Sequence, residues 1–376
     1  MSAIAVGIGV VALIVGFGVY FNSPDLNKAA SGRQDNFVPA TVVENGTTTN
    51  VKIDKSQFKL APELDKISGY INTDKVTIAG LKGKVVLVDF WTYSCINCIR
   101  TIPYLNSWYD KYAKDGLVIV GVHSPEFEFE KDYNNVKAAT EKFEIKYPVV
   151  QDNDKGTWNA YENRYWPHKY LVDIDGYIRY DHIGEGNYGA TEQVIQSLLS
   201  ERAGRMGMNV TIDQSISNPA NAQSVDFGQI DTPEIYLGYQ FARASLGNPE
   251  GFKPDQIVKY SIPENTAILP NRVYLEGEWK NTADHMELQS DEGRVVLSYS
   301  AKAANIVAGG SAQLHVSEDG SNLTSSSRGA EVSEDGNATV DQLKLYNLTM
   351  HHDYGKHQIV IDVKGKGFQI FTFTFG

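Results

Sequence analysis

The sequence predicts an N-terminal transmembrane helix, an α/β domain with helices flanking a central sheet, and an all-β sandwich domain. Three observations predict this organisation. Residues 3–21 form a run of nineteen uncharged, mostly apolar residues. Between residues 60 and 205, apolar strand patterns alternate with helical patterns, which is typical of an α/β sheet. After residue 224, short alternating segments follow one another without a long helical pattern, which favours a β-sandwich.

Length and composition limit the classes of function. A chain of 376 residues has room for two complete cores, and a hydrophobic content of 42% is typical of globular proteins. The net charge is −12 and no basic stretch interrupts it, so nucleic acid is not an expected partner. Two cysteines are too few for a four-cysteine zinc site, and His351-His352 is an adjacent pair far from them, so we predict no metal site.

The first predicted element is a membrane anchor at residues 1–22. As a helix, its apolar run would be about 28 Å long, close to the thickness of a bilayer core. A cleaved signal peptide is the alternative, but its basic N-terminal region and small-x-small cleavage site are not clear. Lys28 and Arg33 follow the run, which taken alone favours a cytoplasmic C-terminus, but Asp25 and Asp35 dilute these two charges and leave only a small bias. Residues 23–55 are polar and are predicted to be a tether.

The α/β domain is predicted at residues 56–207. Its expected elements, in order, are strand 84–90, helix 96–113 with a kink at Pro103, strand 117–123, helix 136–143, a hairpin of strands 169–173 and 177–182, and helix 191–202. A polar connector is predicted at residues 208–228.

The all-β domain is predicted at residues 229–376. Alternation predicts strands at residues 294–300, 312–316, 342–346, 357–363 and 368–375, with Asp-Gly turns at residues 319–320 and 335–336. Four aromatic residues have two open interpretations, a sugar-stacking platform or, more commonly, sandwich core. They are Tyr236, Tyr239, Tyr274 and Trp279.

Cys95 and Cys98 are the most informative residues, since they are the only cysteines and stand two residues apart after a buried strand. This spacing is typical of a thiol–disulfide exchange site, and it implies no cofactor beyond a redox-active Cys95–Cys98 disulfide. Cys95 is expected to be the more exposed residue, at a helix N-terminus that favours its thiolate. Cys98, one turn inside, can close the disulfide after a mixed disulfide forms.

Two further residues are candidates for this chemistry. Asp89 lies in the middle of an apolar strand, where burial would raise its pKa and make it a proton acceptor for Cys98. A solvent-facing strand carboxylate is the alternative. Pro167 in Trp166-Pro167 precedes a strand, where a cis peptide could expose backbone to a substrate. An ordinary trans proline is the alternative.

These motifs resemble a known superfamily. The pattern Asp-Phe-Trp-x3-Cys-x2-Cys, with Pro103 and Pro167, resembles the thioredoxin superfamily, and the segment 118–165 resembles its membrane-associated TlpA/ResA-type subgroup. The segments 91–103, 121–127, 165–170, 232–238 and 371–376 are more similar still to the DipZ-type family.

The resemblance implies a TlpA-type thioredoxin-like domain with a central mixed sheet, then a jelly-roll-like sandwich similar to carbohydrate-binding modules. It implies Cys95 as nucleophile, Cys98 as resolving thiol and Pro167 as the cis residue. Trp91, Trp166 and Glu126 are substrate-binding candidates, and for Glu126 an unspecialised loop carboxylate is an equal alternative.

The predicted function is therefore that of a single-pass, membrane-anchored thiol–disulfide oxidoreductase on the extracytoplasmic side. It is expected to reduce protein disulfides with electrons from a separate membrane donor of the DsbD or cytochrome-c-biogenesis type, and its second domain would dock a partner or bind a glycan. One alternative is a peroxiredoxin-like peroxidase, because Thr92-x-x-Cys95 matches that signature, although Val88 stands where a proline is expected. The other is a non-enzymatic envelope glycan-binding protein.

Overall fold

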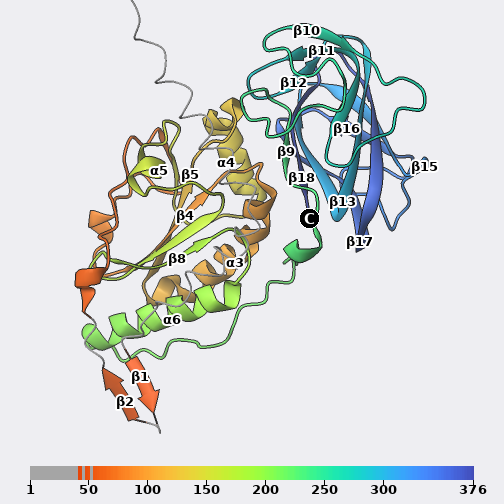
Figure 1. The fold of residues 1–376 in the computed structure, drawn as a ribbon. Coiled ribbons are helices and arrows are strands. Elements are labelled where there is room, and N and C mark those ends of the chain that lie inside the picture. Colours follow the sequence, from red (N-terminus) through yellow and green to blue (C-terminus); the bar gives the residue numbers. More distant parts are fainter. Residues whose placement is uncertain (1–40, 45–46, 51–53) are drawn as a thin grey trace, which may run out of the picture. The chain divides into compact units, whose positions relative to one another are not determined.

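The computed structural model describes residues 41–44, 47–50 and 54–376 (Figure 1). The predicted membrane anchor at residues 1–22 lies outside the described residues. Within the part of the chain that the structure describes, no helix is both long and apolar enough to cross a lipid bilayer.

The backbone groups into two compact units. The first comprises the described residues up to Thr92 together with Thr101–Ser124 and Thr140–Ala220. The second comprises Tyr93–Arg100, Pro125–Ala139 and Asn221–Gly376. The loop that carries both cysteines therefore groups with the C-terminal part of the chain.

The first unit contains a six-stranded mixed sheet, as the resemblance implies. Its strand order is β3 (Gly69–Ile71), β6 (Val149–Gln151), β5 (Leu117–His123), β4 (Val85–Trp91), β7 (His168–Val172) and β8 (Ile178–Ile183). The β4–β5 and β5–β6 pairs are parallel and the other three pairs are antiparallel. The thioredoxin-like α/β prediction is confirmed.

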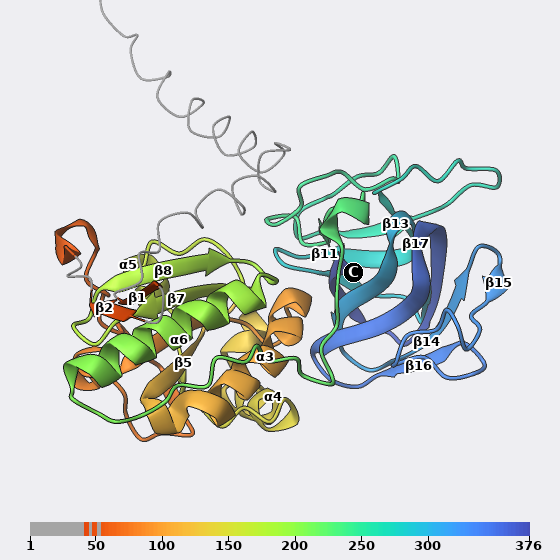
Figure 2. The ribbon, with the colours of Figure 1, turned by 90° about the horizontal axis from the view of Figure 1, so that it is seen from below.

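Successive side chains of β4 point to opposite faces of the sheet. Val86, Val88 and Phe90 pack in a core cluster with Trp158 of α5 (Gly156–Ala160). Asp89 is one residue out of phase with them and points to the opposite face of the sheet. The other α-helices among the described residues are α3 (Ile96–Tyr112), α4 (Tyr133–Lys142) and α6 (Tyr188–Arg205). Figure 2 shows α6 running along the first unit.

Part of the predicted tether, residues 23–55, has secondary structure that the sequence analysis did not predict. Residues 41–44 and 47–50 form two antiparallel strands, β1 (Thr41–Glu44) and β2 (Thr47–Asn50), and a short 3₁₀ turn follows at Lys55–Gln57. Inter-strand hydrogen bonds do not require apolar side chains, so the polar composition of this segment hid them from the pattern search.

The C-terminal part of the second unit is rich in β-strands. The described strands are β9 (Ile235–Tyr236), β10 (Ile257–Tyr260), β11 (Val273–Asn281), β12 (Met286–Leu288), β13 (Glu292–Gly309), β14 (Ala312–Glu318), β15 (Ser321–Asn322), β16 (Asn337–Val340), β17 (Lys344–Lys364) and β18 (Gln369–Phe375). Every pairing among them is antiparallel. The strands β11, β12, β18 and β13 pair in a closed circuit around a large apolar core.

Two sequence interpretations change in this region. The segments 342–346 and 357–363, predicted as separate strands, belong to the single long strand β17, which runs beside β13 (Figure 1). Tyr236, Tyr274 and Trp279 are at most 5% exposed and belong to the interior, so they do not form a sugar-stacking platform. Burial of these large rings stabilises the fold instead.

Candidate active site

Cys95 and Cys98 lie at the junction between β4 and α3. Cys95 directly precedes α3, and its carbonyl oxygen accepts the first helical hydrogen bond from the Ile99 N–H. Cys95 is half-buried, whereas Cys98 is 1% exposed. This agrees with the expectation that Cys95 is the sulfur a substrate can reach.

The Cys95 sulfur occupies the position of a helix N-cap side chain. The backbone N–H of Cys98 donates a hydrogen bond to Cys95 Sγ over 3.3 Å. The first turn of α3 contains no acidic residue. The sulfur therefore lies at the positive end of the helix dipole with a helix N–H directed at it, a position that suits a sulfur nucleophile.

Asp89 is buried in β4, with 2% of its surface exposed, so the solvent-facing alternative is wrong. Its Oδ1 atom has no hydrogen-bond partner among the described residues. Burial raises the pKa of Asp89 to about 7, and the positive charge of Lys169 opposes this rise. A carboxyl that titrates near neutral pH can take up and return a proton under physiological conditions.

Lys169 is a residue that the sequence reasoning missed. It stands opposite Asp89 in the β4–β7 register, is fully buried, and donates a hydrogen bond from Nζ to the carbonyl oxygen of Gly184 over 2.8 Å. The sequence did offer a signal for Lys169, namely a lysine inside a predicted strand. A lysine is almost never fully buried without a partner, so a lysine in a buried strand indicates a nearby partner group. Lys169 is placed to moderate the pKa of Asp89.

Pro167 and Trp166 lie at the start of β7 in the first unit. The Trp166–Pro167 peptide bond is cis, the conformation that the resemblance implies. The Trp166 ring packs 4.2 Å from the ring of Trp158, and its Nε1 donates to the carbonyl oxygen of Ser124 over 2.9 Å. Trp166 is half-buried, so part of its ring remains open to contact.

Trp91 differs from Trp166. It is 2% exposed and its ring meets the His123 ring edge-on at 5.2 Å. The Trp91 side chain offers almost no surface to a client, so its substrate-binding role stays a prediction without support from its exposure. Trp91 packs inside the first unit at the end of β4.

Glu126 belongs to a hydrogen-bonded network in the second unit. The Tyr236 hydroxyl lies 2.6 Å from Glu126 Oε1 and 2.8 Å from Glu234 Oε2. Burial raises the pKa of Glu126 to about 8, and repulsion from Glu234 and Glu130 adds to the rise. Because a hydroxyl donates only one proton, a proton on one of the two carboxyls completes this pair of hydrogen bonds, and burial raises the pKa of both Glu126 and Glu234. Glu126 is thus more than a plain loop carboxylate.

Glu130, which the sequence reasoning also missed, connects this network to the cysteine loop. Its Oε2 atom accepts hydrogen bonds from the backbone N–H groups of Glu126 and Phe127 at 2.6 and 3.0 Å. Its Oε1 atom accepts a hydrogen bond from the hydroxyl of Ser94, the residue before Cys95, at 2.5 Å. A fully buried carboxylate with three donors holds the loop in place.

Two family models match the chain. The AhpC/TSA family matches residues 57–181, and the "Thioredoxin like C-terminal domain" matches residues 232–376. Protein DipZ of Mycobacterium bovis is 34% identical over 319 residues, which is 84% of this chain and 43% of DipZ. The chain therefore spans less than half the length of DipZ.

Two shorter relatives match a smaller share of the chain. Thiol-disulfide oxidoreductase ResA of Bacillus cereus is 28% identical over 149 residues, which is 39% of this chain and 82% of ResA. Thiol-disulfide oxidoreductase YkuV of Bacillus subtilis is 30% identical over 140 residues, which is 37% of this chain and 94% of YkuV. Because that match covers nearly the whole of YkuV, the chain belongs to the thioredoxin-like thiol–disulfide oxidoreductases.

Proposed function

We propose that the chain reduces protein disulfides outside the cytoplasm, through the Cys95–Cys98 couple, while anchored to a membrane by residues 1–22. The observation that carries the reaction is the N–H of Cys98 donating to Cys95 Sγ at the start of α3. Family membership supports thiol–disulfide exchange. The reductive direction, the anchor, the clients and a membrane electron donor of the DsbD type are parts of the proposal.

The proposed reaction has two exchange steps. The Cys95 thiolate attacks one sulfur of a client disulfide, forms a mixed disulfide and releases the other client sulfur as a thiolate. Cys98 then loses its proton to the Asp89 carboxylate, and its thiolate attacks Cys95 Sγ. The second client sulfur leaves as a thiolate, and both client thiolates take up protons. The client has gained two electrons and Cys95–Cys98 has become a disulfide, which the donor must reduce.

The remaining candidate residues have supporting roles in this proposal. Pro167 would present the backbone before β7 to an extended client segment, and the exposed part of the Trp166 ring would contact client side chains. Glu126 would act through its protonated carboxyl, next to the loop that Glu130 holds. The β-rich region, which we take to be a jelly-roll-like sandwich, would dock a partner. A glycan ligand would need residues other than the three buried aromatics.

The test is disulfide reduction in insulin by the full chain, with dithiothreitol as the reductant. Cys95→Ser should abolish the acceleration over dithiothreitol alone. Cys98→Ser is the matched variant, since it keeps the attacking sulfur and should accumulate a mixed disulfide visible by mass spectrometry. Undiminished turnover by Cys95→Ser would refute the mechanism.

The direction of the reaction needs a separate measurement. The equilibrium of the Cys95–Cys98 couple in glutathione buffers gives its reduction potential. A potential near that of thioredoxin, about −270 mV, would support a reductant, and one near about −120 mV would show an oxidant instead.

A peroxidase is the second candidate, favoured by the AhpC/TSA match and by Thr92-x-x-Cys95. Two observations weigh against it. Thr92 is fully buried, with its hydroxyl 3.4 Å from His123 Nε2, and Val88 lies buried in the middle of β4. Consumption of hydrogen peroxide by the reduced chain, faster than its reduction of insulin, would favour the peroxidase.

A further inference from the structure

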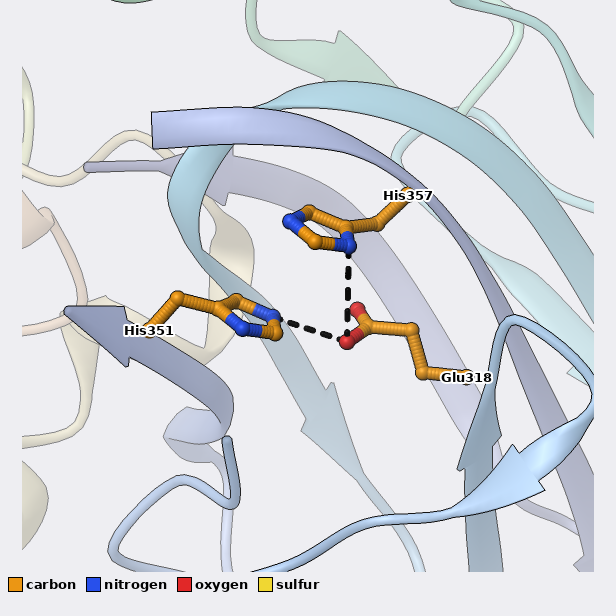
Figure 3. Close-up of side chains that lie close together, drawn as sticks. All are labelled: Glu318, His351 and His357. Atoms are coloured by element: carbon orange, nitrogen blue, oxygen red, sulfur yellow. Dashed lines mark ion pairs between the residues drawn. The ribbon is translucent and has the colours of Figure 1, made fainter. Parts of the chain in front are cut away.

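Two histidines and a glutamate meet on the surface of the β-rich region, far in sequence from the cysteines. His351 Nε2 lies 2.7 Å from Glu318 Oε2, and His357 Nδ1 lies 3.8 Å from the same oxygen. Figure 3 shows ring nitrogens of both histidines facing this carboxylate. The one ligand atom that each residue offers lies within 4.8 Å of the other two.

An irregularity in β17 brings the two histidines together. Six residues of extended strand span about 20 Å, yet the two ring centroids are 4.0 Å apart. Between the pairs Ala301↔Gly355 and Ala303↔Met350, four residues of β17 stand opposite Lys302 alone. The chain folds back there, so His351 returns to the side of His357.

The β14–β17 pairing supplies the glutamate. Glu318 is the last residue of β14 and stands opposite Ile359, two residues after His357. The turn beyond it, at Asp319 and Gly320, has positive φ values of 51° and 75° and turns the chain sharply away. The carboxylate therefore points to the fold in β17 from the neighbouring strand.

The carboxylate is held by a second layer of contacts. Tyr299 donates a hydrogen bond to Glu318 Oε1 at 2.6 Å, and its hydroxyl lies 2.8 Å from Thr349 Oγ1. This fixes one oxygen in the interior and leaves Oε2 directed at the histidines. Hydrogen-bonded support of a ligating carboxylate is typical of metal sites.

The contact between His351 and Glu318 is close without being a hydrogen bond. Although the two atoms are 2.7 Å apart, His351 Nε2 has no hydrogen bond of acceptable geometry with any described residue. The histidines are 16% and 17% exposed, so an ion could reach them. His351 Nε2 and Glu318 Oε2 are thus close to each other without a hydrogen bond between them, and both could bind the same metal ion.

We propose that Glu318, His351 and His357 bind a divalent transition-metal ion, with zinc as the reference ion. Zinc bonds of about 2.0–2.1 Å in tetrahedral geometry place ligand atoms about 3.3 Å apart. The two separations from Glu318 Oε2, 2.7 and 3.8 Å, lie on either side of that value. Shifts of about half an ångström, with a turn of the imidazole rings, bring the three atoms into range.

The donor set also favours this class of ion. Two imidazoles and one carboxylate suit zinc better than calcium or magnesium, which prefer oxygen ligands alone. Water completes the fourth position. Asp319 Oδ2 lies 2.9 Å from His357 Nδ1, so metal binding through that nitrogen would replace this contact. The bound ion would tie the folded segment of β17 to β14.

The test is zinc binding by the full chain in a Cys95→Ser/Cys98→Ser background, because free thiolates also bind zinc. Titration calorimetry should show one site, and cobalt should give the visible absorption of a tetrahedral complex. His351→Ala and His357→Ala should each weaken the affinity at least about tenfold. His352→Ala is the matched control, since His352 is adjacent, 95% exposed and paired only with Asp353 within the described residues.

The control should change the affinity by less than about twofold, because an exposed pair contributes little. Absence of zinc binding by the folded chain, or unchanged binding in both His→Ala variants, would overturn the proposal. Diethyl pyrocarbonate labelling provides a measurement without variants of the site. Zinc should protect His351 and His357 from modification and leave His352 reactive, and equal modification with and without zinc would also overturn it.

Discussion

Two buried carboxylates, one in each unit, lie in β-strands with opposite surroundings. Asp89 in β4 has an oxygen without a hydrogen bond among the described residues, and burial raises its pKa to about 7. Glu318 in β14 accepts a hydrogen bond from Tyr299 on one oxygen and faces two histidines with the other. The comparison teaches that a buried carboxyl without a full set of hydrogen bonds suits proton transfer, whereas a hydrogen bond to one oxygen fixes a carboxyl in orientation so that its other oxygen can face a cation.

The largest expected effect concerns the stability of the α/β region. The folded-state pKa of Asp89 is above its ordinary 3.8, so between about pH 4 and 7 the folded chain binds more protons than the unfolded chain. Stability therefore falls as the pH rises through this window and stays low above it. Asp89→Asn cannot ionise and should be about 4 kcal/mol more stable than wild type at pH 8, since the pKa of Asp89 rises from 3.8 to about 7.

Urea unfolding at pH 8, 6 and 4 measures this difference, which should shrink towards pH 4. A less stable Asp89→Asn at pH 8 would mean that Asp89 is ionised in the folded state and stabilised by Lys169. That result would remove the contrast with Glu318.

Asp89→Asn should also slow the reduction of insulin. Without a proton acceptor for Cys98, insulin reduction at pH 7 should fall about tenfold to a hundredfold. Asp110→Asn is the control, because Asp110 is exposed and pairs with exposed Lys146. Equal rates for wild type and Asp89→Asn would exclude Asp89 from the proton transfer, even if its pKa is raised.

On the other side of the comparison, Tyr299→Phe tests whether hydrogen bonding sets the role of Glu318. The variant leaves Glu318 Oε1 and Thr349 Oγ1 without the tyrosine hydroxyl in a buried place. It should lower the free energy of unfolding by about 1–2 kcal/mol and the zinc affinity about tenfold. Tyr239→Phe is the control, because that hydroxyl contacts the exposed carboxylate of Asp255.

The smallest expected effect concerns Asp319, the exposed carboxylate beside the proposed metal site, in contrast to the buried Glu318. Asp319 is 54% exposed and contacts His357, so its charge is screened by water. Asp319→Asn should weaken zinc binding only about threefold, measured by the same titration calorimetry. A loss as large as that of His357→Ala would make Asp319 a ligand in place of water.

The sequence could predict most of the α/β region because its signals are local. The apolar run of β4, the cysteines after it and the helical spacing of α3 are each visible within a few residues. Burial of Asp89 followed from the same run. Lys169 was missed because its contact with Asp89 depends on the β4–β7 register, which pairs residues 80 positions apart and leaves no local pattern.

The cluster in the β-rich region could not be predicted for a related reason. The sequence shows His351 and His357 six residues apart, which in a regular strand means distant. The four residues of β17 that have no partner in β13 bring the two histidines together. Where these four residues fall depends on how the long strands β13 and β17 align. The β1–β2 hairpin was missed although Asn45-Gly46, a dipeptide favoured in tight hairpins, separates its strands in the sequence.

The position of β18 has a consequence for the order of folding. This strand, residues 369–375, pairs with β12 and β13 and closes the circuit of strands. During synthesis, residues 369–375 leave the ribosome after the strands with which they pair. Until then β12 and β13 lack this partner, and their open edges are exposed to edge-to-edge aggregation.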